Sequence, residues 1–95
     1  MTDPEIRRNA RAIFRRLESG AGGVLLDLES GEYRHLNEIG ALIWESLESH
    51  PSRTALLADL RRTITNAPAS IETEVDAFLG ALLERGLIEV VPTGA

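Results

Sequence analysis

Residues 25–37, LLDLESGEYRHLN, constrain the fold more than any other part of the chain, because they combine a β-hairpin with a helix cap. The aliphatic run Val24–Leu28 is typical of a strand, and Ser30-Gly31 is suited to the turn that follows it. Tyr33–Leu36 forms the returning strand, and Asn37 comes directly after it. The sequence therefore predicts two antiparallel strands that lead straight into a helix.

Two registers of this hairpin are compatible with the sequence. A two-residue loop sets Asp27 opposite Arg34, which is favourable, but it also sets Glu29 opposite Glu32, which is not. A three-residue loop with Gly31 in the left-handed conformation avoids that repulsion. The residues do not decide between the two.

Three helices are expected after the hairpin. Asn37 is a strong N-cap for the first, EIGALIWESLES, which Pro51 follows. The second should span roughly residues 53–65, and the third should be capped by Ser70 and end at Arg85-Gly86, a basic last turn with a glycine cap. Apolar residues at helical spacing should face the core: Ile39, Leu42, Ile43 and Leu47, then Leu56, Leu57, Leu60 and Ile64, then Ile71, Val75, Phe78, Leu79 and Leu82.

The N-terminal segment is ambiguous. Its apolar residues recur at helical spacing, and Asp3-Pro4 is a good start for a helix. AIFRRL at residues 12–17 also suits a strand, with ESGAGG as its turn. Periodicity slightly favours the helix. The apolar residues concerned are Ile6, Ala10, Ile13, Phe14 and Leu17.

The charge is distributed unevenly along the chain. The net charge of the 95 residues is −5. Five arginines and two acidic residues give residues 1–17 a charge of +3, so the rest of the chain carries −8. An acidic body opposes nucleic acid as a partner.

The length suits one domain, and the chain has no cysteine. It also shows neither a membrane-length apolar run nor a signal peptide, so we expect a cytoplasmic protein.

No catalytic or metal-binding constellation is visible. His35 and His50 are the only histidines, and neither has a second ligand at metal-binding spacing. GAGG at residues 20–23 lacks the lysine and the following Ser or Thr of a phosphate loop. We therefore expect a protein that is not an enzyme and that needs neither a cofactor nor a metal.

The strand Tyr33–Leu36 is a candidate binding edge. It carries neither the proline nor the lysine that often protects an edge strand, and a meander of three strands would leave one of its sides unpaired. The alternative is that a loop, or the apolar LIEVV at residues 87–91, covers this edge.

Gly80 is the second unusual feature, because glycine inside a helix costs about 1 kcal/mol relative to alanine. On a helical wheel, Asp76, Gly80 and Leu83 form one strip beside the buried stripe, with Leu79 at its border. A neutral surface glycine is the alternative. Together, the edge strand and this notched strip would form a groove for a peptide.

The chain resembles the PqqD-like family, the leader-recognition domains of ribosomal-peptide pathways. The resemblance covers roughly residues 22–90 and is closest to the stand-alone leader-binding proteins of lasso-peptide clusters. It rests on an ordered set of features: Leu25-Leu26-Asp27, Ser30-Gly31 with Tyr33, Leu36-Asn37, Gly40 with Ile43-Trp44, and Phe78-Leu79 with Gly86-Leu87.

The resemblance implies an α+β, winged-helix-like fold, in which a three-stranded antiparallel sheet is followed by three helices. It implies a first strand within residues 11–18, which we adopt over the periodicity. The expected boundaries are a flexible basic segment at residues 1–10, a leader-binding domain at residues 11–91 and a frayed tail at residues 92–95.

The resemblance also implies that a precursor leader docks antiparallel along the third strand, against the third helix. We expect a monomer, without nucleic acid or membrane, that presents the leader to a separate leader peptidase and lasso cyclase. The alternative is a winged-helix DNA-binding transcriptional regulator. The implied peptide-binding residues are Tyr33, Arg34, His35, Leu36, Asp76, Leu79, Gly80 and Leu83.

Overall fold

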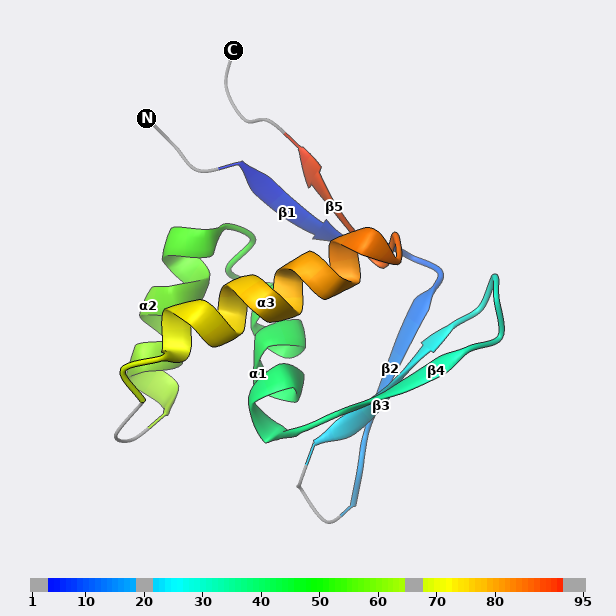
Figure 1. The fold of residues 1–95 in the computed structure, drawn as a ribbon, viewed down its shortest axis with the longest axis horizontal. Coiled ribbons are helices and arrows are strands. Elements are labelled where there is room, and N and C mark those ends of the chain that lie inside the picture. The colour runs from blue at the N-terminus through cyan, green and yellow to red at the C-terminus, as the bar shows by residue number, and fades with distance from the viewer. Residues whose placement is uncertain (1–3, 19–21, 65–67, 92–95) are drawn as a thin grey trace.

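Five strands and three helices make up the computed structural model, which describes residues 4–18, 22–64 and 68–91 (Figure 1). Strands β2, β3 and β4 form one antiparallel sheet, and β1 pairs with β5 in a second. The predicted α+β fold and its three-stranded sheet are therefore confirmed. The elements are β1 (Glu5–Arg8), β2 (Ala12–Arg16), β3 (Gly23–Asp27), β4 (Tyr33–Leu36), α1 (Glu38–Ser46), α2 (Arg53–Thr63), α3 (Ile71–Glu84) and β5 (Ile88–Val91).

The helix suggested by the periodicity of the N-terminal segment is wrong, and the strand implied by the resemblance is present as β2. Along β2, Ala12 and Phe14 are half-buried, whereas Ile13 is exposed, which is the alternation of a strand. Glu5–Arg8, expected in a flexible segment, instead forms β1 and pairs with β5. These pairings bring together segments far apart in the sequence, which local periodicity does not register.

The β3–β4 hairpin adopts neither predicted register. Leu25 pairs with Arg34, and the Asp27 amide donates to the Glu32 carbonyl at 2.9 Å, which leaves residues 28–31 as the loop. Gly31 takes the left-handed conformation, with φ of 76°, as the three-residue loop required. The hairpin thus has a longer loop than either alternative, and Glu29 does not face Glu32.

The helices begin and end close to the expected residues. Asn37 accepts the Gly40 amide at 2.8 Å, and Ser52 accepts the Ala55 amide at 3.2 Å. The cap predicted at Ser70 is wrong, because Ser70 precedes α3 but makes no side-chain capping bond. At the other end of α3, Gly86 has φ of 72° and the Leu87 amide donates to the Leu82 carbonyl, the Schellman arrangement predicted by the glycine.

The core lies between the helices and the inner faces of the two sheets. Most of the apolar residues expected to face it are buried, whereas Ile39, Leu42, Ile64, Phe78 and Leu79 are only partly so. Trp44, which the helical stripe did not include, is also buried. No helix in the described part of the chain is long and apolar enough to cross a membrane. The helix α2 ends at Thr63, before the expected residue 65, because Ile64 is already extended. The expected tail at residues 92–95 lies outside the described residues.

Candidate functional site

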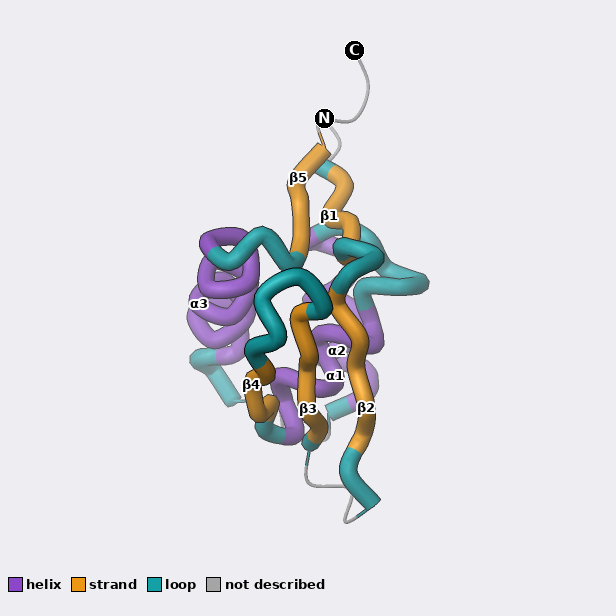
Figure 2. The backbone as a smooth tube through the Cα atoms, turned by 90° about the vertical axis from the view of Figure 1, so that its right-hand side faces the viewer, coloured by secondary structure: helices purple, strands orange, loops and turns teal. Residues whose placement is uncertain are grey.

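Within residues 4–18, 22–64 and 68–91, no strand pairs with the outer edge of β4. In the order β2–β3–β4, the strand has β3 on one side only, and LIEVV pairs with β1 instead of covering the other side. Figure 2 shows β4 at the margin of the sheet, with α3 beyond it. The alternative that the C-terminal segment blocks this edge is therefore wrong.

The register determines which main-chain groups of β4 face outward. Hydrogen-bonded pairs alternate along an antiparallel ladder, and Asp27 and Glu32 occupy such a position because the Asp27 amide donates to the Glu32 carbonyl. Leu25–Arg34 must then be a hydrogen-bonded pair as well. Tyr33 and His35 fall between these pairs, so their N–H and C=O groups point away from β3. A peptide strand placed at this edge would find two donors and two acceptors.

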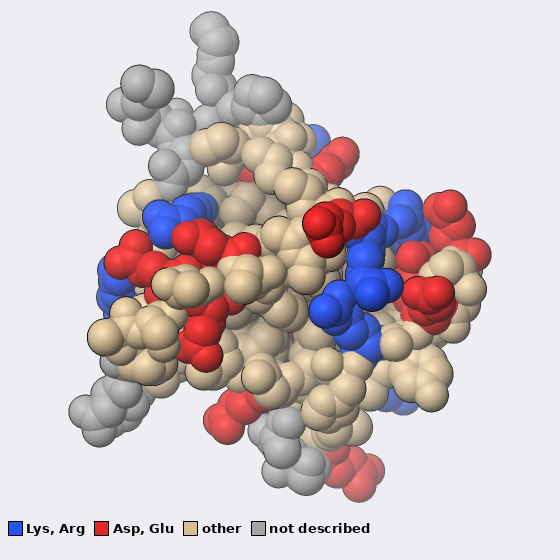
Figure 3. All heavy atoms as spheres, in the orientation of Figure 1, with Lys and Arg blue, Asp and Glu red and all other residues tan. Residues whose placement is uncertain are grey.

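A groove of about 540 Å³ lies beside this edge, between the β3–β4 hairpin and the C-terminal end of α3. Leu25 and Leu87, which are 1% and 3% exposed, contribute apolar surface to it. Figure 3 shows basic side chains gathered on this face of the molecule. The groove combines an apolar surface with charged margins. Its lining residues are Leu25, Asp27, Ser30, Gly31, Glu32, Tyr33, Arg34, Arg85 and Leu87.

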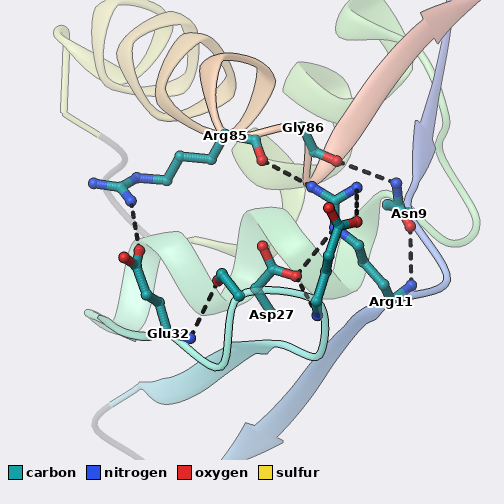
Figure 4. A network of polar contacts seen from close by, with 8 residues as sticks. Asn9, Arg11, Asp27, Glu32, Arg85 and Gly86 are labelled. Atoms are coloured by element: carbon teal, nitrogen blue, oxygen red, sulfur yellow. Dashed lines mark hydrogen bonds and ion pairs between the residues drawn. The ribbon is translucent and has the colours of Figure 1, made fainter.

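The Arg11 side chain contacts two residues that line the groove, Asp27 and Arg85 (Figure 4). Its Nε donates to Asp27 Oδ1 at 3.0 Å, and its Nη2 donates to the Arg85 carbonyl at 3.0 Å, so that one side chain joins the hairpin to the end of α3. Burial acts to raise the pKa of Asp27, but the Glu29 amide and the Arg11 guanidinium outweigh it, and the pKa is lowered. Asp27 is therefore held as a carboxylate that is already paired with a cation.

The structure brings only part of the predicted site together. Tyr33 and Arg34 line the groove, and His35 and Leu36 continue along β4, His35 exposed and Leu36 buried. The α3 residues Leu79, Gly80 and Leu83 do not line it, although Leu83 is 48% exposed. Asp76 is bonded by both Nε and Nη2 of Arg53, at 2.8 and 3.1 Å. The α3 strip therefore stays a prediction.

Sequence reasoning missed the far wall of the groove. The sequence predicts Arg85 at the end of a helix, Leu87 in an extended segment and Glu32 in the hairpin, and it assigns none of them to the site. A signal for Arg85 was present in the arginine next to the capping glycine, which places a cation at the end of α3. Nothing in the sequence indicated that the hairpin would reach it.

A Ser–His–Asp group joins α1 and α2 but does not have the geometry of a catalytic triad. The Ser46 hydroxyl donates to Asp59 Oδ2 at 2.6 Å, and His50 Nδ1 lies 3.5 Å from Ser46 Oγ and 3.7 Å from Asp59. In a triad the carboxylate would orient the histidine and leave the hydroxyl to the other ring nitrogen. This contact ties the helices together. Among the described residues, no group of three or more His, Cys, Asp or Glu could hold a metal ion.

The groove lies within a segment that has known relatives. The family described as coenzyme PQQ synthesis protein D (PqqD) matches residues 22–88, which include β3, β4 and all three helices. The chain belongs to the PqqD family. The resemblance stated from the sequence is therefore confirmed. No curated protein matches the chain.

Two solved structures share the fold of this PqqD-family chain. "TbiB1 in Complex with the TbiA(beta) Leader Peptide" is 23% identical, with a TM-score of 0.73, over 87% of this chain and 94% of that one. "Lasso peptide synthetase B1 complexed with the leader peptide" is 28% identical, with a TM-score of 0.71, over 90% of this chain and 98% of that one. Each of these two relatives is described as binding a leader peptide.

Proposed function

We propose that this protein is a non-catalytic module that binds the leader of a precursor peptide by adding the leader as a strand to β4. The observation that carries the proposal is the outward direction of the Tyr33 and His35 main-chain groups at an edge that no described strand covers. Strand addition uses such groups for affinity and neighbouring pockets for selectivity. The groove beside β4 supplies the pocket, and the family and the two leader-bound relatives support the assignment.

The proposed site extends across the cleft to α3. The peptide would contact Tyr33, Arg34, His35 and Leu36 on one side, and the strip of Asp76, Leu79, Gly80 and Leu83 on the other. Exposure of Leu83 and the open space around Gly80, where an added Cβ would meet nothing within 4 Å, supports this second wall.

The bound leader would be presented to separate enzymes, a leader peptidase and a lasso cyclase. A module that holds precursor and enzyme together raises their effective concentration, and a protein without catalytic groups can increase product formation in this way. We propose that it does so as a cytoplasmic monomer without a cofactor.

Fluorescence polarisation tests the proposal with a labelled leader peptide, taken from a short precursor identified by reading the neighbouring genes. We expect saturable binding to the parent protein and competition by the unlabelled leader. A scrambled peptide of the same composition should not compete. Absence of saturable binding to the leader would contradict the proposal.

A DNA-binding regulator is the alternative function, and no observation favours it. The helix α3 contains four acidic residues and no arginine or lysine, which is the wrong sign for a phosphate backbone. A mobility-shift experiment should show no salt-sensitive binding to duplex DNA. Micromolar binding that weakens with salt would favour the alternative.

A further inference from the structure

The Arg34 side chain points to the groove side of β4. Tyr33 and His35 are exposed, whereas Arg34 is partly buried and Leu36 is fully buried, so the odd and even residues of the strand face opposite ways. Arg34 also lines the groove together with Arg85. The guanidinium of Arg34 therefore lies where a peptide added to β4 would place alternate side chains.

Among the charged residues described in the lining of this groove, Arg34 alone forms no ion pair. Its Nη1 is buried and has no hydrogen-bond partner among the described residues. Both acids of the groove are already engaged, Asp27 by Arg11 at 3.0 Å and Glu32 by Arg85 at 3.4 Å. Within the described part of the chain, the Arg34 guanidinium forms no ion pair. A cationic N–H without an acceptor is unfavourable, so an acceptor brought by a bound peptide would stabilise the Arg34 side chain.

The register of β3 and β4 predicts which residue of a bound peptide would supply the acceptor for Arg34. A peptide strand at the open edge bonds to Tyr33 and His35, and one of its residues then lies directly opposite Arg34 in a non-hydrogen-bonded pair. Such residues point to the same face, with Cβ atoms about 4.5–5.5 Å apart. A neutral acceptor at this position would satisfy the N–H but leave the charge unpaired. A carboxylate satisfies both and can bind the guanidinium with two parallel hydrogen bonds.

We propose that Arg34 is a specificity residue for leader binding, and that the leader residue paired directly opposite it is Asp or Glu. This inference rests on the proposed function, because it requires a peptide strand on β4. It adds a requirement that strand addition alone does not make, since main-chain bonding accepts any side chain at this position.

A charge-reversal selection tests the inference. Random phage-displayed peptides long enough to span β4 are selected on the parent protein and on Arg34→Glu. We expect peptides from the parent to share an acidic residue at one aligned position, and peptides from Arg34→Glu to carry Lys or Arg at that position. Enriched peptides without this change of sign would overturn the inference while leaving strand addition intact. If neither protein enriches any peptide, the leader-binding proposal itself fails, and the inference fails with it.

A double-mutant cycle then measures the contact with one selected acidic peptide. Replacing its acidic residue by the matching amide should weaken binding to the parent about ten-fold or more, and binding to Arg34→Gln about two-fold or less. Arg15→Gln, which removes the same charge from an exposed position on β2, serves as the control and should respond like the parent. Equal losses on the parent and on Arg34→Gln would overturn the inference. If Arg34→Gln does not fold, the peptide substitution on the parent still decides, because an unchanged affinity contradicts the contact.

Discussion

Proline substitutions at adjacent residues of β4 separate its two edges. His35 directs its amide away from β3, whereas the amide of Arg34 belongs to the hydrogen-bonded pair with Leu25. His35→Pro therefore removes a donor from the open edge and leaves the internal ladder complete. Proline is tolerated at such positions, where the missing N–H would face solvent. We expect His35→Pro to fold and to bind the leader more weakly.

The magnitude follows from the one hydrogen bond removed. A peptide carbonyl left without its donor in a closed interface costs about 1–3 kcal/mol, which weakens binding roughly 5- to 150-fold. His35→Ala keeps the amide and should bind within about two-fold of the parent if the exposed imidazole contributes little. Arg34→Pro should instead lower the free energy of unfolding by about 1–3 kcal/mol, because it breaks the bond to Leu25.

The measurements are fluorescence-polarisation affinity for the labelled leader and urea unfolding, on the parent and on all three variants. The reasoning would be refuted if His35→Pro bound the leader as tightly as the parent and unfolded at the same urea concentration. That result would mean that the outer edge of β4 does not bond to the peptide. Loss of stability in His35→Pro but not in Arg34→Pro would show that the register is the reverse of the one described.

Two further predictions concern the helices. An added Cβ at Gly80 meets nothing within 4 Å, so Gly80→Ala should raise the free energy of unfolding by up to about 1 kcal/mol. Gly80→Leu should melt like the parent but weaken leader binding by about 1–3 kcal/mol. Unchanged leader affinity of Gly80→Leu would exclude the α3 strip from the site. The Ser46 hydroxyl and, to a smaller extent, Arg62 lower the pKa of Asp59. The ionised Asp59 carboxylate therefore stabilises the fold above about pH 4, and this contribution is lost as the pH falls through the lowered pKa. In urea unfolding, the stability difference between the parent and Asp59→Asn should shrink from about pH 7 to about pH 3; a constant difference would contradict this role.

Local signals in the sequence predicted the elements that depend on neighbouring residues. Asn37 and Gly86 act as the caps that their residue types suggest, because a cap needs only its own helix end. The three helices follow for the same reason. The N-terminal segment could not be predicted in this way, since Ile6 becomes buried only after β1 pairs with β5 at the opposite end of the chain.

The candidate site, like the fold, could be predicted from the sequence only in part. An unprotected strand at Tyr33–Leu36 was readable from its composition, but the direction of each amide depends on the register, which was not. The two registers predicted from the sequence depend on charges within the hairpin alone. In the structure, the Asp27 carboxylate is engaged by Arg11, which lies outside the hairpin, so repulsion within the hairpin was only part of the balance. The groove wall formed by Arg85 likewise depends on contact between distant segments.

Amide hydrogen exchange along β4, measured with and without the leader, tests the central claim most directly. In the free protein, the Arg34 and Leu36 amides should be protected by β3, while those of Tyr33 and His35 exchange rapidly. Addition of the leader should protect Tyr33 and His35 and leave the outward amides of Phe14 and Arg16 on β2 unchanged. New protection at Phe14 and Arg16, with no change at Tyr33 and His35, would contradict the account.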